Sequence, residues 1–173
     1  MKKSAALTAI VAILFTVAGV WFGNHRINPT AAEPAAVTNL FAQSLPTLTN
    51  TSEALGQWRG KRLLVNFWAT WCTPCVQEMP ELSALQTELG SNTLQIVGIG
   101  IDSPVNIKEF NQKLPVSYPL YIGGMGGSEL ARQFGNQAGG LPFTVLIEAN
   151  GSIKKTYLGR LKLEELRHDL ASK

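Results

Sequence analysis

A short apolar run that leads into a pair of cysteines dominates the hydrophobic pattern of the chain. Residues 63–68 are almost continuously apolar, which is typical of a parallel strand buried on both faces. The pattern then changes to the helical period from about Thr73 to Leu89. Pro74 suits the first turn of that helix, Pro80 should kink it, and Gly90 should end it. The pattern predicts a central strand followed directly by a helix.

The segments before the central strand have weaker patterns. Residues 41–48 alternate loosely between apolar and polar positions, and Pro46 favours an edge, so we expect a strand or a hairpin there. Residues 55–61 contain two glycines and predict a turn region.

Further elements alternate downstream of the first helix. Residues 94–101 predict a buried strand, and Asp102-Ser103-Pro104 is a start signal for a helix that runs to about Lys113. Residues 115–122 hold two prolines and a short extended piece. The glycine-rich stretch 123–127 predicts a flexible surface loop, after which Ser128 should cap a short helix to Phe134.

The last third of the chain predicts a hairpin and a closing helix. Strands are expected at Phe143–Glu148 and at Ile153–Leu158, and Asn150-Gly151 between them is a strong turn signal for antiparallel neighbours. Residues 163–171 predict a final helix. Without the first strand and the segment near 102–127, the order is a β-α-β unit joined to a β-β-α unit. This is the arrangement of the thioredoxin fold, an α/β class with helices on both faces of a mixed central sheet.

The N-terminus carries the pattern of a membrane segment. Lys2 and Lys3 precede an uncharged run from Ser4 to Gly23, whose length of about 20 residues suffices to span a bilayer as a helix. We therefore expect a signal anchor at residues 1–23, a linker with extended, mobile backbone at 24–37, and a globular domain at 38–173. The two lysines favour a cytoplasmic N-terminus, with the domain exported. A cleaved signal peptide is the alternative.

Composition and charge narrow the class of partner. The formal net charge is +3 and the lysines and arginines are scattered along the chain, so nothing indicates nucleic-acid binding. A hydrophobic content of 45% fits one globular domain with a membrane segment added.

Cys72 and Cys75 are the only cysteines of the chain, and their position suggests redox chemistry. A C-x-x-C pair at a helix N-terminus lies where the helix dipole and free N–H groups favour thiolate over thiol. Cys72 precedes the helix and should be the nucleophile, whereas Cys75 inside the first turn should resolve the mixed disulfide. Glu78 lies one turn further on and could accept a proton from Cys75, although a solvated helix carboxylate is the alternative.

Two other roles for a C-x-x-C pair fit less well. A zinc site needs about four ligands, and the two histidines, His25 and His168, lack ligand spacing to the cysteines. A purely structural disulfide across two residues would constrain the unfolded chain very little. We therefore expect a redox-active dithiol and no other cofactor.

The string NFWATWCTPC at residues 66–75, with VQEMP after it, resembles the membrane-anchored, thioredoxin-like TlpA/ResA group of thiol-disulfide oxidoreductases. The segment Gly-Leu-Pro-Phe-Thr at residues 140–144 strengthens the resemblance, which extends from about Phe41 to the C-terminus. It implies that Pro142 is cis and packs beside the cysteines, and that Leu141 offers its backbone to an extended substrate. It also implies that a glutamate at position 78 tunes the dithiol. The residues near 102–127 resemble the insertion of this group.

Several residues around the motif complete the predicted site. Trp71 should belong to an apolar contact face, and Thr73 and Pro74 should adjust the properties of the dithiol. Cytoplasmic thioredoxins usually carry a buried aspartate where this chain has Asn66, so the proton acceptor is missing there. This departure gives Glu78 more weight.

The resulting hypothesis is a bacterial inner-membrane protein with one membrane pass and its catalytic domain in the periplasm. It would be a monomer that reduces protein disulfides, receives electrons from a membrane thiol relay, and could serve cytochrome c maturation. A thiol oxidase is one alternative, and a metal or haem chaperone that uses the C-x-x-C pair as a transfer ligand is another. The P-x-x-x-T-x-x-C motif of a peroxidase is absent.

Overall fold

The structure is a computed structural model, and it describes residues 34–172. The predicted membrane anchor at 1–23 and most of the predicted linker lie outside the described residues. Within residues 34–172, no helix combines the length and the apolar character needed to cross a bilayer. The proposed division at 1–23, 24–37 and 38–173 therefore remains a prediction.

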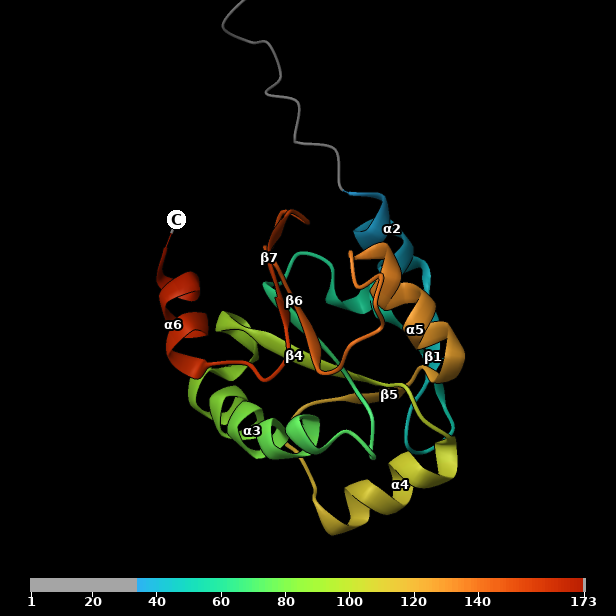
Figure 1. The fold of residues 1–173 in the computed structure, drawn as a ribbon. Helices are drawn as coiled ribbons and strands as arrows, with labels where there is room; N and C mark the ends of the chain where they lie inside the picture. Colours follow the sequence, from blue (N-terminus) through green and yellow to red (C-terminus); the bar gives the residue numbers. More distant parts are fainter. Residues whose placement is uncertain (1–33, 173) are drawn as a thin grey trace, which may run out of the picture. The chain divides into compact units, whose positions relative to one another are not determined.

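A five-stranded mixed sheet forms the centre of the described unit (Figure 1). Its strands, in spatial order, are β5 (Leu120–Ile122), β4 (Gln95–Gly100), β3 (Leu63–Trp68), β6 (Phe143–Ile147) and β7 (Ile153–Leu158). β3 is parallel to β4 and antiparallel to β6, with Val65 opposite Val97 on one side and Val145 on the other. Every residue of β3, β4 and β6 is buried, which explains why these segments lack a polar-apolar alternation.

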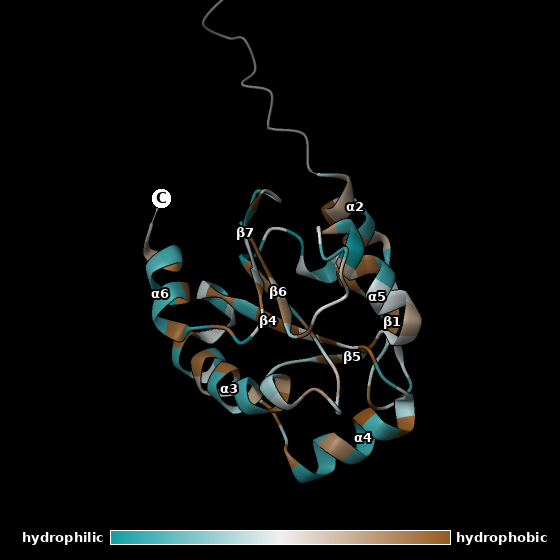
Figure 2. Ribbon diagram, viewed as in Figure 1, coloured by the Kyte–Doolittle hydropathy of each residue, from teal (hydrophilic) through white to brown (hydrophobic). Residues whose placement is uncertain are grey.

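Helices cover both faces of this sheet (Figure 1). One face packs against α3 (Thr73–Thr93), α4 (Pro104–Lys113) and α6 (Leu163–Ala171), and the other against α2 (Ala35–Ala42), the 3₁₀ helix η1 (Leu55–Trp58) and α5 (Gly124–Gln133). Figure 2 shows the central strands mostly in brown, whereas the helices carry more hydrophilic teal. The expected α/β thioredoxin arrangement is confirmed, with α4, β7 and α6 at their predicted bounds.

The N-terminal segment of the described unit differs from the prediction. Residues 35–42 form α2, so the last part of the predicted extended linker and the start of the predicted strand at Phe41 are helical. Val37, Leu40 and Phe41 are buried on one helical face against the sheet. The linker prediction rested on the prolines and on the small number of large apolar residues, although the alanines of this stretch are good helix formers.

A small hairpin follows α2, so the hairpin expectation for residues 41–48 is partly confirmed. β1 (Ser44–Pro46) pairs antiparallel with β2 (Ser52–Ala54), and Thr47 bridges to Tyr121 of β5. The hairpin therefore lies along the edge of the main sheet.

The glycine-rich stretch is the second clear difference. Residues 124–127 belong to the first turn of α5, and Gly123 is its N-cap, so the predicted flexible loop and the predicted start at Ser128 are wrong. A Cβ atom on Gly123 would lie 2.6 Å from Ile99 Cγ2, and Gly127 is buried against the same strand. Close packing of the helix on the sheet requires residues without side chains at these positions.

The remaining segments refine the prediction. Gly90 interrupts α3 with φ +67°, as expected for a helix stop, while the backbone of α3 stays helical through Pro80. Residues 102–127 contain α4, β5 and the start of α5, and β5 joins the sheet as a parallel neighbour of β4.

Candidate active site

Cys72 and Cys75 form a disulfide at the N-terminus of α3, with an S–S distance of 2.08 Å. Cys72 is the N-cap residue of the helix, and its Sγ accepts a hydrogen bond from the backbone N–H of Cys75 at 3.3 Å. Cys72 is 5% exposed and Cys75 is fully buried, in the order predicted for a nucleophile and a resolving residue. Free N–H groups and the positive end of the helix dipole surround the sulfur atoms, which favours a thiolate on Cys72.

The turn between β3 and α3 is fixed by Asp102, which follows β4. Asp102 Oδ2 accepts hydrogen bonds from the backbone N–H of Thr70, at 3.3 Å, and from the Thr70 hydroxyl. Its Oδ1 accepts from the Ser103 N–H and from the Asn106 amide. Burial alone would raise the pKa of Asp102, but these donors outweigh it and lower the pKa. The sequence identified Asp102 only as part of a helix start.

Glu78 is buried beneath the first turn of α3. Its Oε1 accepts a hydrogen bond from the Asn66 amide at 2.7 Å, and its Oε2 accepts from the backbone N–H of Leu161 at 2.8 Å. Glu78 and Cys75 are three residues apart on one helix, a spacing that places their side chains on the same face. The structure therefore differs from a solvated helix carboxylate, the alternative considered for this residue.

Burial raises the pKa of Glu78 above its ordinary value of 4.5, and this effect exceeds the opposing effects of its two hydrogen bonds and of the charge on Arg160. Arg160 itself pairs with Glu81, at 2.5 Å between Nη2 and Oε1. A carboxyl group that holds its proton more tightly than usual is closer to a thiol in proton affinity and exchanges a proton with it more readily. Glu78 is thus suited to proton transfer.

Pro142 lies at the same end of the sheet as the cysteines. Phe67 pairs with Phe143, so the residues before β6 and the residues after β3 emerge side by side. The Leu141–Pro142 peptide bond is cis, as the family resemblance implies, and Pro142 is buried. Its carbonyl oxygen accepts a hydrogen bond from Gly159 N–H at 2.8 Å.

The predicted contact residues differ in exposure. Trp71 is 68% exposed, Thr73 is exposed, and Pro74 and Leu141 are partly buried. Leu158 is also exposed, and its Cδ1 lies 3.0 Å from the Cβ position of Gly140, next to Leu141. Sequence analysis did not single out Leu158, because a leucine at the end of a strand is typical of core composition.

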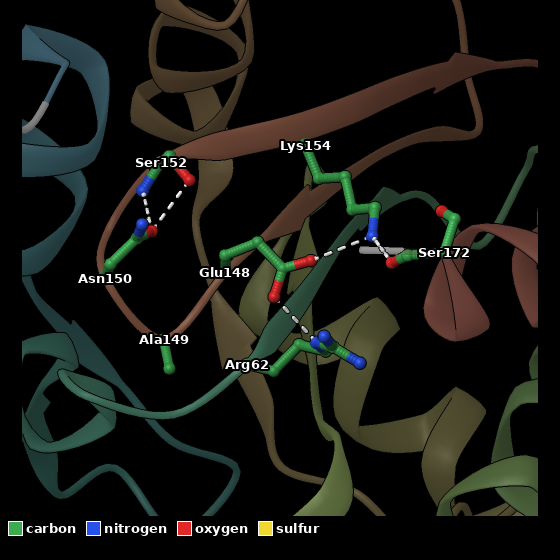
Figure 3. Close-up of a pocket in the computed structure, with 7 residues that line it drawn as sticks. All are labelled: Arg62, Glu148, Ala149, Asn150, Ser152, Lys154 and Ser172. Carbon is green, nitrogen blue, oxygen red and sulfur yellow. Dashed lines mark hydrogen bonds and ion pairs between the residues drawn. The ribbon is translucent and has the colours of Figure 1, made fainter. Parts of the chain in front are cut away.

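A pocket of about 500 Å³ lies away from this site (Figure 3). Glu148 occupies its centre and pairs with Arg62 at 2.7 Å and Lys154 at 3.2 Å. Both cations also donate to backbone carbonyls of the C-terminal segment, those of Leu170 and Ser172. Arg62 precedes β3 and Cys72 follows it, so this pocket lies about 20 Å away at the other end of the strand. Arg62 and Lys154 thereby connect this pocket to the C-terminal segment.

Within residues 34–172, no group of three or more His, Cys, Asp or Glu side chains is arranged to hold a metal ion. The chemistry that the described site offers is that of the two sulfur atoms, one buried carboxyl group and the backbone beside Pro142.

Comparison with known proteins assigns the family. Residues 30–170 match the Redoxin family. The chain belongs to the Redoxin family. The thiol-disulfide oxidoreductase ResA of Geobacillus thermodenitrificans is 29% identical over 99% of this chain and 98% of its own length. The thioredoxin-like protein YneN of Bacillus subtilis is 29% identical over 73% of this chain and 74% of its own.

Solved structures show the same fold. A thioredoxin-related protein from Neisseria meningitidis serogroup B is 32% identical and superimposes with a TM-score of 0.65, covering 73% of this chain and 95% of that one. With its C-x-x-C disulfide, this Redoxin family member is a ResA-like thiol-disulfide oxidoreductase.

Proposed function

We propose that this protein reduces disulfide bonds of other proteins through Cys72 and Cys75, outside the cytoplasm. The observation that carries the proposal is the Cys72–Cys75 disulfide at the N-terminus of α3, with Glu78 buried one turn away. The two sulfur atoms differ in exposure, and only the outer one can be approached by a partner.

The proposed exchange proceeds in two steps that balance. The thiolate of reduced Cys72 attacks one sulfur of a substrate disulfide, forms a mixed disulfide and releases the other substrate sulfur as a thiolate. The thiolate of Cys75 then attacks Cys72 Sγ, re-forms the intramolecular disulfide and releases the second substrate sulfur. Two electrons pass to the substrate, whose two thiolates take up two protons.

Glu78 is the proposed acceptor for the proton that Cys75 loses before it attacks. The carboxyl group is buried on the same helical face, and its raised pKa brings its proton affinity closer to that of a thiol. Asn66 cannot take this role, because a neutral amide does not accept a proton at accessible pH. The amide instead donates a hydrogen bond to Glu78.

Substrate binding is proposed along the segment before β6. The backbone of Leu141 would pair with an extended substrate strand, and Trp71 would provide apolar contact area beside the sulfur. Thr73 and Pro74 lie between the cysteines on the exposed side and would contact the same substrate.

The proposal extends to where the protein acts in the cell. The uncharged run at residues 4–23 supports an inner-membrane anchor with the domain in the periplasm, and an oxidised compartment requires a membrane thiol relay to supply electrons. Cytochrome c maturation, in which apocytochrome cysteines are kept reduced, is the role that the TlpA/ResA resemblance implies.

The decisive experiment combines the reduction potential with trapping of the intermediate. The potential of the Cys72–Cys75 pair in the full-length protein should lie near that of thioredoxin, about −270 mV, when equilibrated against a dithiothreitol series. Cys75→Ser should accumulate a mixed disulfide with a disulfide-bonded protein substrate. Cys72→Ser should accumulate none, because Cys75 is fully buried.

A potential near about −120 mV would identify a thiol oxidase instead. Equal trapping by the two serine variants would contradict the assignment of Cys72 as the nucleophile.

A further inference from the structure

Three buried side-chain polar atoms have no hydrogen-bond partner among the described residues: Asn66 Oδ1, Trp68 Nε1 and the Tyr118 hydroxyl. Asn66 and Trp68 are fully buried and Tyr118 is 4% exposed. An unpaired polar group inside a protein is costly, and native structures normally satisfy such groups with protein or with an ordered water molecule. The position of these three atoms is therefore informative.

All three side chains lie on the α3 face of the sheet, around Gly98. Asn66 pairs with Thr144 on one side and with Gly98 on the other. Its Nδ2 donates to Thr144 Oγ1, at 3.0 Å, and to Glu78. Because the amide nitrogen donates to both of these acceptors, Asn66 Oδ1 is the atom of the amide that stays unpaired.

The other two side chains converge on the same place. Trp68 Nε1 and Tyr118 Cε2 each lie 3.3 Å from the position that a Cβ atom on Gly98 would occupy. Leu120 Cδ2 lies closer still, at 2.6 Å, so the absence of a side chain at residue 98 leaves room for a leucine methyl group, the indole and the phenol ring beside Asn66. One unpaired donor, one unpaired acceptor and one unpaired hydroxyl thus belong to side chains that lie around Gly98.

We propose that Asn66, Trp68 and Tyr118 together bind one buried water molecule, and that Tyr118 acts through this water as a positioning residue for the Asn66–Glu78 pair. The water accepts from the indole N–H, donates to Asn66 Oδ1 and bonds the Tyr118 hydroxyl. This set matches the three hydrogen bonds that a typical buried water makes. It fixes the amide orientation from the side opposite Thr144 and Glu78.

The consequence concerns the ionised form of Glu78. The Asn66 amide stabilises the carboxylate by donating to it, and burial opposes ionisation. Arg160, Glu81 and Tyr118 are the charged or titratable groups that act on or respond to Glu78, whereas the two cysteines on its own helix form a disulfide and do not titrate. Burial, and then the charge of Glu78, raise the pKa of Tyr118, so its hydroxyl keeps its proton and stays available for hydrogen bonding.

The inference concerns the resting, oxidised protein and holds whether or not the proposed reductase activity does. A high-resolution crystal structure of the full-length protein should show a water within hydrogen-bond distance of all three atoms. An empty site, or a direct hydrogen bond between Asn66 and Trp68, would contradict the proposed water.

The positioning role is tested by titrating the ¹³C-labelled carboxyl of Glu78 by NMR in Tyr118→Phe. This variant keeps the ring in the core and removes only the hydroxyl, so the amide should donate less firmly and the Glu78 titration midpoint should move to higher pH. Tyr121→Phe is the matched control. Tyr121 belongs to β5, and its hydroxyl accepts from Trp58 and donates to Glu53. Its loss should therefore leave the Glu78 titration midpoint unchanged.

Identical midpoints in wild type and Tyr118→Phe would exclude Tyr118 as a positioning residue. An equal shift in the Tyr121→Phe control would show a general loss of packing, and would exclude the specific role as well. Disulfide exchange does not enter either measurement, so failure of the proposed function would leave this test unaffected.

Discussion

Glu78 shows at the residue scale how burial and hydrogen bonding together set the pKa of a carboxyl group on the helix that carries the two cysteines. Its carboxyl group is buried away from water and accepts hydrogen bonds from two donors, the Asn66 amide and the Leu161 N–H. Removal from water favours the protonated form, while both donors favour the carboxylate. Desolvation prevails, so the pKa rises and the group binds its proton more tightly in the folded chain than in the unfolded one.

This difference makes stability depend on pH. Below the ordinary pKa of 4.5, Glu78 is protonated in both states and its contribution to folding is fully present. As the pH rises through the folded-state pKa, the buried group must ionise and that contribution is lost, at about 1.4 kcal/mol per unit of pKa difference. We predict that Glu78→Gln is more stable than wild type at neutral pH, and that the gain disappears in acid. Urea unfolding of the oxidised protein across a pH series measures this.

Glu81→Gln is the control, because it removes a more exposed carboxylate, 39% accessible, from the same helix. Its ion pair with Arg160 is worth at most about 1 kcal/mol, and no gain at neutral pH is expected. A Glu78→Gln variant less stable than wild type at neutral pH would mean that the two donors outweigh desolvation.

At the scale of elements, α5 depends on glycine for its distance from the sheet. Gly123 lies so close to β4 that a methyl group there would meet Ile99 Cγ2 at 2.6 Å and the backbone of Gly127 at 3.1 Å. Gly126 belongs to the same first turn but is exposed, with nothing within 4 Å of its Cβ position. The glycines in one short stretch therefore serve different purposes.

We predict opposite effects for alanine at these two positions. Gly123→Ala should lower the free energy of unfolding by about 1–3 kcal/mol, because it forces the helix away from a packed strand. Gly126→Ala should raise it by about 0.5–1 kcal/mol, because alanine loses less conformational freedom in a helix. Urea unfolding of both variants at one pH measures the difference. Equal effects would contradict the packing of α5.

At the scale of the whole described unit, the two ends of β3 have separate tasks. The residues after its C-terminal end carry the disulfide and Glu78, and the cis-proline segment that precedes β6 lies at the same end of the sheet. Arg62 precedes its first residue and, with Glu148 and Lys154, holds the C-terminal segment (Figure 3). Both ends belong to the same sheet, but no side-chain hydrogen bond among those described joins one end to the other.

We predict that Glu148→Gln destabilises the protein without changing its redox chemistry. The variant leaves two partly buried cations without their carboxylate and should lower the free energy of unfolding by about 1–2 kcal/mol. The reduction potential of the Cys72–Cys75 pair should stay at the wild-type value, which a dithiothreitol titration checks. Glu129→Gln is the control, since its exposed pair with Arg132, at 3.5 Å, should contribute little.

A changed potential in Glu148→Gln would show that the two ends of the sheet are coupled. An unchanged stability would mean that α6 is held by its apolar contacts alone.

The sequence predicted more of the site than of its surroundings. Cys72, Cys75 and Glu78 follow one another at intervals of three residues, so successive turns at the start of one helix place them along one face without any long-range information. The cis form of Pro142 followed only from the family resemblance. The sequence did not indicate that Asp102 bonds Thr70 or that Thr144 bonds Asn66, because these contacts join segments that are distant in the chain and meet only in the folded sheet.

The sequence by itself determined the apolar strand β3, the helix with the cysteine pair at its start, the β6–β7 hairpin and hence the fold class, because periodicity, proline and glycine signals act over a few residues. Only the tertiary structure decided that 35–42 and the glycines of 124–127 are helical, and that Glu78 is buried on Asn66. Those outcomes depend on which surfaces pack against each other, and burial between segments distant in the chain outweighs local propensity there.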